Sequence, residues 1–145
     1  MKRDGMLYLT KRVAFCAAHR LHHPDWDDAR NAAIFGKCAT EGGHGHNYVL
    51  EVTVRGRPDP ETGMVVDLKE LKAVILREFW DRCDHRDFNH DVDFMEGRIP
   101  TAENIAVAAW EVLEPALPPG ILHRIRLYET ERNSVDYYGP EGSES

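Results

Sequence analysis

The chain has 145 residues, of which 42% are apolar and 30% are charged, a composition typical of one soluble domain with a sizeable core. No apolar run approaches the roughly 20 residues that span a bilayer, and the N-terminal sequence MKRDGMLYL lacks the apolar segment of a secretory signal. The net charge of −7 argues against binding of nucleic acid through a basic face, but it is compatible with a small anionic ligand. We expect one domain over residues 1–145, flexible ends at residues 1–6 and 139–145, and neither nucleic acid nor a membrane as partner.

Two stretches in the first half of the chain alternate apolar and polar residues, and they predict β-strands at residues 7–18 and 47–55. Because side chains on a strand point alternately to its two faces, each stretch presents one apolar row to a core. The turn sequence RPDPETG then precedes a predicted short strand at residues 64–66. The apolar rows are Val13, Phe15 and Ala17 on the first strand, and Tyr48, Leu50, Val52 and Val54 on the second.

Two helices are predicted in the middle of the chain. Asp67 occupies the N-cap position of a helix over residues 68–83, with Glu70 in the capping-box position. A loop-like segment follows, and Thr101 is the expected N-cap of a second helix that ends near Pro115.

Two further strands, at residues 121–130 and 134–138, are predicted to pair as a hairpin across the sequence TERN. The resulting order separates strands from helices, so it predicts an α+β fold with a mostly antiparallel sheet and helices on one face. The exposed edges of a small open sheet favour oligomerisation by edge pairing. Side chains expected on one face of the longer strand are Ile121, His123, Ile125, Leu127 and Glu129.

Histidines and cysteines give the first indication of function, because the chain carries eight histidines and three cysteines. The cysteines, Cys16, Cys38 and Cys83, are widely spaced and odd in number, so we expect reduced thiols and a cytoplasmic protein. Cys16 and Cys83 lie among apolar residues and are expected to be small core residues.

Three histidines extend the apolar rows of the first two strands. His44 and His46 share the parity of Tyr48, and His19 continues the row that ends at Ala17. If the ends of these rows are adjacent, the three imidazoles can converge on one ion. Three neutral imidazoles with an open fourth position are typical of a catalytic zinc ion, which polarises a substrate oxygen.

Two other interpretations of these residues remain open on pattern alone. The sequence HGH is compatible with a flexible exposed loop, with His19 as an ordinary residue at the end of a strand. Alternatively, Cys38, His44 and His46 form a zinc cluster without His19, although the CxxC spacing that makes such clusters recognisable is absent.

Five motifs, in order along the chain from about residue 8 to residue 138, resemble the family of 6-pyruvoyl-tetrahydropterin synthase and 6-carboxy-tetrahydropterin synthase. They read FCAAHRL, FGKCATEGGHGHNY, CDHRDFN, IPTAEN and LYETERNSVDY. The resemblance implies the T-fold, a four-stranded antiparallel sheet with two helices on one face. It also implies subunits that form a barrel, commonly a trimer stacked into a hexamer, with active sites between subunits.

The resemblance further implies the chemistry of the site. The substrate would be 7,8-dihydroneopterin triphosphate, and one zinc ion per subunit would be held by His19, His44 and His46. Cys38 matches the catalytic cysteine of the family, the base that removes a side-chain proton from the polarised substrate. A thiol needs a neighbouring imidazole or cation to ionise near neutral pH.

Five other residues receive roles from the same resemblance. His85 matches the histidine partner of the cysteine, with Asp84 orienting it, and a neighbouring subunit supplies this pair in the family. Glu129 matches the anchor of the pterin ring, whose adjacent N–H groups suit a bidentate carboxylate. Thr101 and Glu103 match a motif near the pterin pocket, although helix capping and the helix dipole explain them equally well.

An insertion-like loop is expected at residues 26–34. The longer segment that carries Cys38 favours the pyruvoyl-forming branch, which belongs to tetrahydrobiopterin biosynthesis. The close alternative is the 6-carboxy-5,6,7,8-tetrahydropterin synthase reaction of queuosine biosynthesis, which releases acetaldehyde and triphosphate. A further alternative is a zinc-binding or pterin-binding module without turnover, which would need neither Cys38 nor His85. Candidate cations for the triphosphate are Lys37, Arg20, Arg30 and Arg86.

Overall fold

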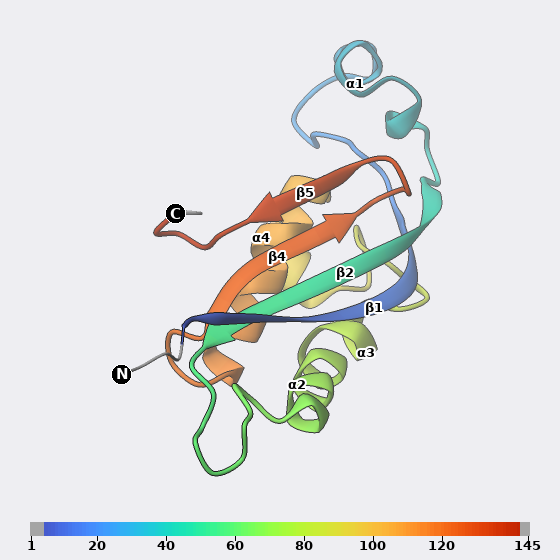
Figure 1. Ribbon diagram of the computed structural model, residues 1–145. Coiled ribbons are helices and arrows are strands. Elements are labelled where there is room, and N and C mark those ends of the chain that lie inside the picture. Colours follow the sequence, from blue (N-terminus) through green and yellow to red (C-terminus); the bar gives the residue numbers. More distant parts are fainter. Residues whose placement is uncertain (1–4, 143–145) are drawn as a thin grey trace.

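The computed structural model describes residues 5–142 as a five-stranded sheet with α2, α3 and α4 on one face and α1 apart from the sheet (Figure 1). The strands are β1 (Leu7–His19), β2 (His44–Gly56), β3 (Arg86–Asp87), β4 (Leu122–Tyr128) and β5 (Ser134–Tyr137). The α-helices are α1 (Asp28–Phe35), α2 (Leu68–Ile75), α3 (Asp81–Cys83) and α4 (Ala102–Leu113). Shorter helical turns are η1 (Gly36–Ala39), η2 (Leu76–Trp80), η3 (Asp93–Met95) and η4 (Glu114–Ala116).

The sheet has the strand order β3-β1-β2-β4-β5. Neighbours among β1, β2, β4 and β5 pair antiparallel, which confirms the expected α+β class and the four-stranded antiparallel sheet. The two-residue strand β3 adds an unexpected fifth member that runs parallel to β1 at the edge. Backbone hydrogen bonds flank it, from His85 N to Cys16 O at 2.6 Å and from Phe88 N to Ala18 O at 2.8 Å.

The helical segment at residues 68–83 is continuous, as predicted, with the π-turn η2 between α2 and α3. Asp67 caps it, since its side chain accepts a hydrogen bond from Lys69 N at 2.8 Å. Thr101 caps α4 in the same way, by accepting from Asn104 N at 3.1 Å. In residues 5–142, no helix has both the length and the apolar character needed to cross a membrane.

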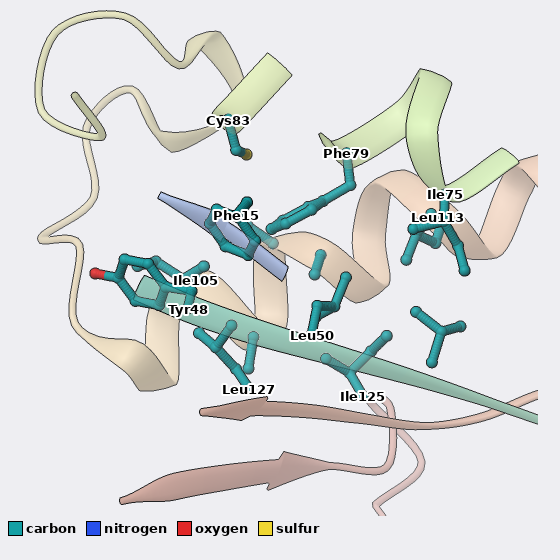
Figure 2. Close-up of a cluster of buried hydrophobic side chains, with 14 of the residues drawn as sticks. Phe15, Tyr48, Leu50, Ile75, Phe79, Cys83, Ile105, Leu113, Ile125 and Leu127 are labelled. Carbon is teal, nitrogen blue, oxygen red and sulfur yellow. The ribbon is translucent and has the colours of Figure 1, made fainter. Parts of the chain in front are cut away.

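The core lies between the sheet and the segments α2–α3 and α4, where the inward rows of the strands meet the apolar faces of the helices (Figure 2). The predicted alternation on β1 and β2 is confirmed, because alternate side chains are buried towards the centre of the sheet. Cys83 is buried as expected, whereas Cys16 is exposed because it has the opposite parity to its neighbour Phe15. The largest side chains of this core include Phe15, Tyr48, Leu50, Ile75, Phe79, Leu113, Ile125 and Leu127.

Two local expectations are wrong. Residues 64–66 do not form a strand, because they make no ladder with a neighbouring strand, and Val65 and Val66 pack against the core from an irregular segment. The segment expected as a loop before Phe35 instead forms α1. Asp27 caps this helix by accepting a hydrogen bond from Arg30 N at 2.8 Å.

The alternation expected on β4 is interrupted at His123. The register between β2 and β4 shifts between Thr53 and Val54, which makes His123 the extra residue of a bulge. Leu122 is therefore buried in its place, and the ring of His123 lies 4.8 Å from the ring of Tyr8. The alternation resumes beyond the bulge and continues to the end of the strand.

The ends of the chain fall largely outside the described residues. Of the segments expected to be flexible, residues 1–4 and 143–145 are not described. Gly139 is described and is buried, and a Cβ atom added to it would lie 2.5 Å from the Trp110 ring. The chain after β5 therefore packs against α4 at this point.

The core predicts that two isoleucines contribute very differently to the free energy of unfolding. We expect Ile75→Ala, at a fully buried position, to lower the free energy of unfolding by about 2–5 kcal/mol, because it removes apolar contacts and leaves a cavity. The matched control is Ile34→Ala on α1, where the side chain is 62% exposed and the expected change is within about 0.5 kcal/mol. Urea unfolding followed by circular dichroism measures both, and equal losses would contradict this assignment of the core.

Candidate active site

Three histidines meet where β1 ends and β2 begins. The antiparallel register places His19 directly opposite His44, and His46 opposite Ala17 one inward position along. The centroids of the three rings lie between 4.7 and 5.0 Å apart, and one ligand atom from each histidine lies within 4.8 Å of the others. This group, which we call the histidine cluster, can hold a metal ion.

The orientation of His19 is fixed by a backbone carbonyl. Its Nδ1 lies 2.7 Å from Pro100 O, and because a carbonyl oxygen only accepts, Nδ1 carries the hydrogen. The free lone pair of the His19 ring is therefore on Nε2. Nε2 of His19 and Nε2 of His46 are both buried and have no hydrogen-bond partner. Buried imidazole nitrogens without partners, facing one another, fit a divalent metal ion.

Burial favours the neutral form of two of these imidazoles, those of His19 and His46. Desolvation lowers the pKa of His19 below its ordinary value, against opposing contributions from the Pro100 carbonyl and from Glu129. Desolvation also lowers the pKa of His46. Since metal ions bind the unprotonated ring, the lowered pKa values of His19 and His46 favour metal binding.

Glu129 follows β4 and brings a carboxylate to the histidine cluster. Its Oε2 lies 3.7 Å from His19 Nε2, and the side chain is 27% exposed. Tyr48 packs beside the cluster, with its ring centroid 5.6 Å from that of His46, and its hydroxyl oxygen lies at the margin of the apolar core (Figure 2). The site thus combines a metal-binding group with an accessible carboxylate at the boundary of the core.

Cys38 lies in the turn η1 between α1 and β2, and its side chain is partly buried. Its carbonyl accepts a hydrogen bond from Leu21 N at 2.8 Å, whereas its thiol has no hydrogen bond to the rest of residues 5–142. The mutually close metal-ligating atoms come from the three imidazoles and do not include the Cys38 thiol. This geometry favours the three-histidine interpretation over the cluster of Cys38, His44 and His46.

Asp84 and His85 form a hydrogen-bonded pair beside the exposed face of β1. Asp84 Oδ2 lies 2.7 Å from His85 Nδ1, and Asp84 Oδ1 accepts from Cys16 N at 3.0 Å. Desolvation opposes ionisation of Asp84, but these two hydrogen bonds outweigh it and hold its pKa below the ordinary value. The His85 side chain is 78% exposed, its backbone has a φ of 60°, and no hydrogen bond joins it to Cys38 within the described chain.

Thr101 and Glu103 lie at the N-terminus of α4, next to Pro100, which orients His19. Thr101 caps α4, and it also lies near the histidine cluster because it directly follows Pro100. Glu103 is exposed in the first turn and forms no ion pair with any other described residue. The sequence could not identify Pro100 as the partner of His19, because every residue has a backbone carbonyl that can accept a hydrogen bond.

The four candidate cations for the triphosphate lie in different surroundings. Arg20 donates from Nε to Ala39 O at 2.8 Å, and the Arg30 guanidinium lies 4.0 Å from the centroid of the Trp26 ring. Lys37 is exposed on η1. Arg86 lines a surface pocket of about 480 Å³, together with His46 and His85.

The fold and the histidine cluster define a class, an α+β protein with three histidines that can hold a metal ion at one end of its sheet. Residues 8–140 match the family model described as 6-pyruvoyl tetrahydropterin synthase. The chain belongs to this family, which confirms the resemblance seen in its motifs.

Individual relatives agree with this assignment. The 6-pyruvoyl tetrahydrobiopterin synthase of Drosophila melanogaster is 41% identical over 141 residues, which cover 97% of this chain and 84% of that protein. The solved structure of Caenorhabditis elegans 6-pyruvoyl tetrahydropterin synthase matches with a TM-score of 0.90 and 39% identity, covering 96% of this chain and 99% of that one. A 6-carboxy-5,6,7,8-tetrahydropterin synthase from Synechocystis is more distant, at 33% identity over 138 residues, covering 93% of this chain and 95% of that protein.

The ligand assignment predicts which substitutions abolish metal binding. We expect His44→Ala to weaken binding of added zinc by more than about 100-fold, because it removes a direct ligand, whose loss exceeds the effect of losing an outer partner. Cys38→Ala should retain one zinc ion per chain. Isothermal titration and elemental analysis measure both quantities.

The matched control for this experiment is His123→Ala, which removes an imidazole from the bulge on β4 and should leave zinc binding unchanged. Loss of zinc from Cys38→Ala, together with its retention in His19→Ala, would refute the three-histidine site and support the cysteine-containing cluster.

Proposed function

We propose that this chain is a zinc-dependent lyase that converts 7,8-dihydroneopterin triphosphate to 6-pyruvoyl-tetrahydropterin with elimination of triphosphate. The observation that carries the proposal is the convergence of three imidazoles beside the Glu129 carboxylate, in a chain of the 6-pyruvoyl tetrahydropterin synthase family. When bound, zinc would polarise a side-chain oxygen of the substrate and stabilise the negative charge that develops on it. His19, His44 and His46 would hold the ion, with Pro100 fixing the ring of His19.

Glu129 would anchor the substrate. Adjacent N–H groups on the pyrimidine edge of a pterin match the two oxygens of one carboxylate, and this pairing fixes the orientation of the ring. The carboxylate lies 3.7 Å from His19 Nε2, so a pterin bound to it would place its side chain near the histidine cluster. Thr101 and Glu103, at the start of α4, are further candidates for contact with the pterin.

Cys38 would act as the base. Its thiolate would take the proton from the side-chain carbon that carries the polarised oxygen, which forms an S–H bond and leaves the electron pair on the substrate. The two electrons are then redistributed within the substrate while triphosphate departs, so no external oxidant is required. His85 would assist ionisation of the thiol, with Asp84 holding Nδ1 and leaving Nε2 free for proton transfer.

The pair Asp84–His85 would act in the site of a neighbouring subunit. Its support is the exposure of His85 and the absence of a hydrogen bond between it and Cys38 in the part of the chain described. β5 lies at one edge of the sheet, and most of β1 at the other edge has no strand on its outer side, which suits pairing between subunits. A trimer or hexamer with active sites between subunits, in the cytoplasm, remains our expectation.

The second candidate reaction is formation of 6-carboxy-5,6,7,8-tetrahydropterin with release of acetaldehyde and triphosphate. It would use the same metal site, the same substrate and the same cysteine, and it is favoured by the relative named for that reaction. The higher identity to the pyruvoyl-forming relatives places it second. A binding module without turnover would leave Cys38 and His85 without a role.

The product distinguishes these functions. We expect zinc-loaded protein incubated with 7,8-dihydroneopterin triphosphate to release triphosphate and to yield a product with the mass of 6-pyruvoyl-tetrahydropterin, as measured by liquid chromatography and mass spectrometry. Acetaldehyde and the carboxy product would establish the second candidate. Zinc-loaded oligomer that leaves the substrate unchanged would show that the chain is not a synthase of either kind.

The intersubunit arrangement predicts complementation between two inactive variants. Cys38→Ala and His85→Ala should each lose turnover, whereas oligomers refolded from an equal mixture should recover about one quarter of wild-type activity, since that fraction of sites receives both intact residues. The control is a mixture of Cys38→Ala with Cys38→Ser, which should stay inactive. If the first mixture also stays inactive although mixed oligomers form, Cys38 and His85 act from the same chain.

A further inference from the structure

Two consecutive residues directly after β1 hold the turn that carries Cys38. Arg20 Nε donates to Ala39 O at 2.8 Å, and Leu21 N donates to Cys38 O at 2.8 Å. The carbonyls of two consecutive residues, Cys38 and Ala39, are thereby tied to the segment that directly follows His19. The Arg20 side chain is the one flexible link in this attachment, because the other bond is made by the backbone.

The backbone of Arg20 is itself fixed by a side chain from the segment after β3. Arg20 N donates to Asn89 Oδ1 at 2.7 Å, and Asn89 Nδ2 donates to Arg20 O at 2.9 Å. Asn89 in turn is held by its own backbone, which donates to Asp87 Oδ1 at 2.8 Å. Any displacement of the Arg20 backbone would therefore break two hydrogen bonds to the side-chain amide of Asn89.

The segment after the turn also packs closely against the end of β1, at Gly43. Gly43 has a φ of 71°, and a Cβ atom added to it would lie 2.7 Å from His19 O, so only glycine permits this approach. The segment from residue 36 to residue 43 contains both anchors and includes three glycines with positive φ, at positions 36, 42 and 43. A segment with this composition has little intrinsic rigidity, so its position depends on its anchors.

We propose that Arg20 is a positioning residue, which fixes Cys38 relative to the histidine cluster by holding the Ala39 carbonyl, with Asn89 locking the backbone of Arg20. The inference rests on the proposed role of Cys38 as the base. It gives Arg20 a function other than binding the triphosphate, and it gives a function to Asn89, which the sequence motif contains without an assigned role. Proton transfer depends steeply on distance and orientation, so loosening this contact lowers turnover more than it lowers affinity for the substrate.

The test compares Arg20→Met, which removes the donor, with Arg20→Lys, which retains a cationic donor. The matched control is Arg77→Met, since Arg77 is 61% exposed on η2 and pairs with Glu78 away from the site. We expect Arg20→Met to lower kcat by about 100-fold with KM nearly unchanged, Arg20→Lys to be intermediate, and Arg77→Met to match the wild type. Bound zinc, measured in each variant, confirms that the histidine cluster is intact.

A second measurement does not depend on the substrate. Hydrogen exchange followed by mass spectrometry should show faster exchange of the amides in residues 36–43 for Arg20→Met than for Arg77→Met, with protection regained in Arg20→Lys. A large rise in KM with unchanged kcat would overturn the proposal in favour of triphosphate binding, and so would unchanged exchange in residues 36–43. If the wild type shows no turnover, the proposed function fails, while the exchange experiment still decides whether Arg20 holds the turn.

Discussion

The antiparallel pairing of β1 with β2 is the constraint on which the site depends. The ladder runs without a break from Leu7 opposite Gly56 to His19 opposite His44, so the register set in the core is carried to the ends of both strands. Within the same rows, the rings of Phe15 and Tyr48 stack with their centroids 5.0 Å apart. Because a slip of one residue would turn every inward side chain outward, the packing that stabilises the sheet also brings the imidazoles together.

Periodicity explains what the sequence could predict. Alternation with a period of two residues placed His19, His44, His46 and Glu129 on the inward face, and the structure gathers all four at one end of the sheet. The capping signals at Asp67 and Thr101 also located the starts of two helical segments.

The features that could not be predicted from the sequence are not marked by a periodic pattern of apolar residues. The carbonyl of Pro100 and the contacts of Arg20 with Ala39 and Asn89 join loops that are distant in sequence. The strand expected at residues 64–66 failed because β-propensity needs a partner strand. Helix α1 did carry a signal, since Asp27 is a good N-cap before a run containing alanines, and that signal was outweighed by the expectation of an insertion.

The backbone of His85 adopts a conformation that is unfavourable for a residue with a side chain. Among the described residues other than glycine, His85 has the positive φ, 60°, and this left-handed geometry costs a side chain of L configuration roughly 1 kcal/mol relative to glycine. The bond from its backbone N–H to Cys16 O and its contact with Asp84 hold it there. Glycine would adopt this conformation without strain. If His85 acts as proposed, the fold gives up stability at this position to present an imidazole, and a stabilising His85→Gly substitution would remove turnover.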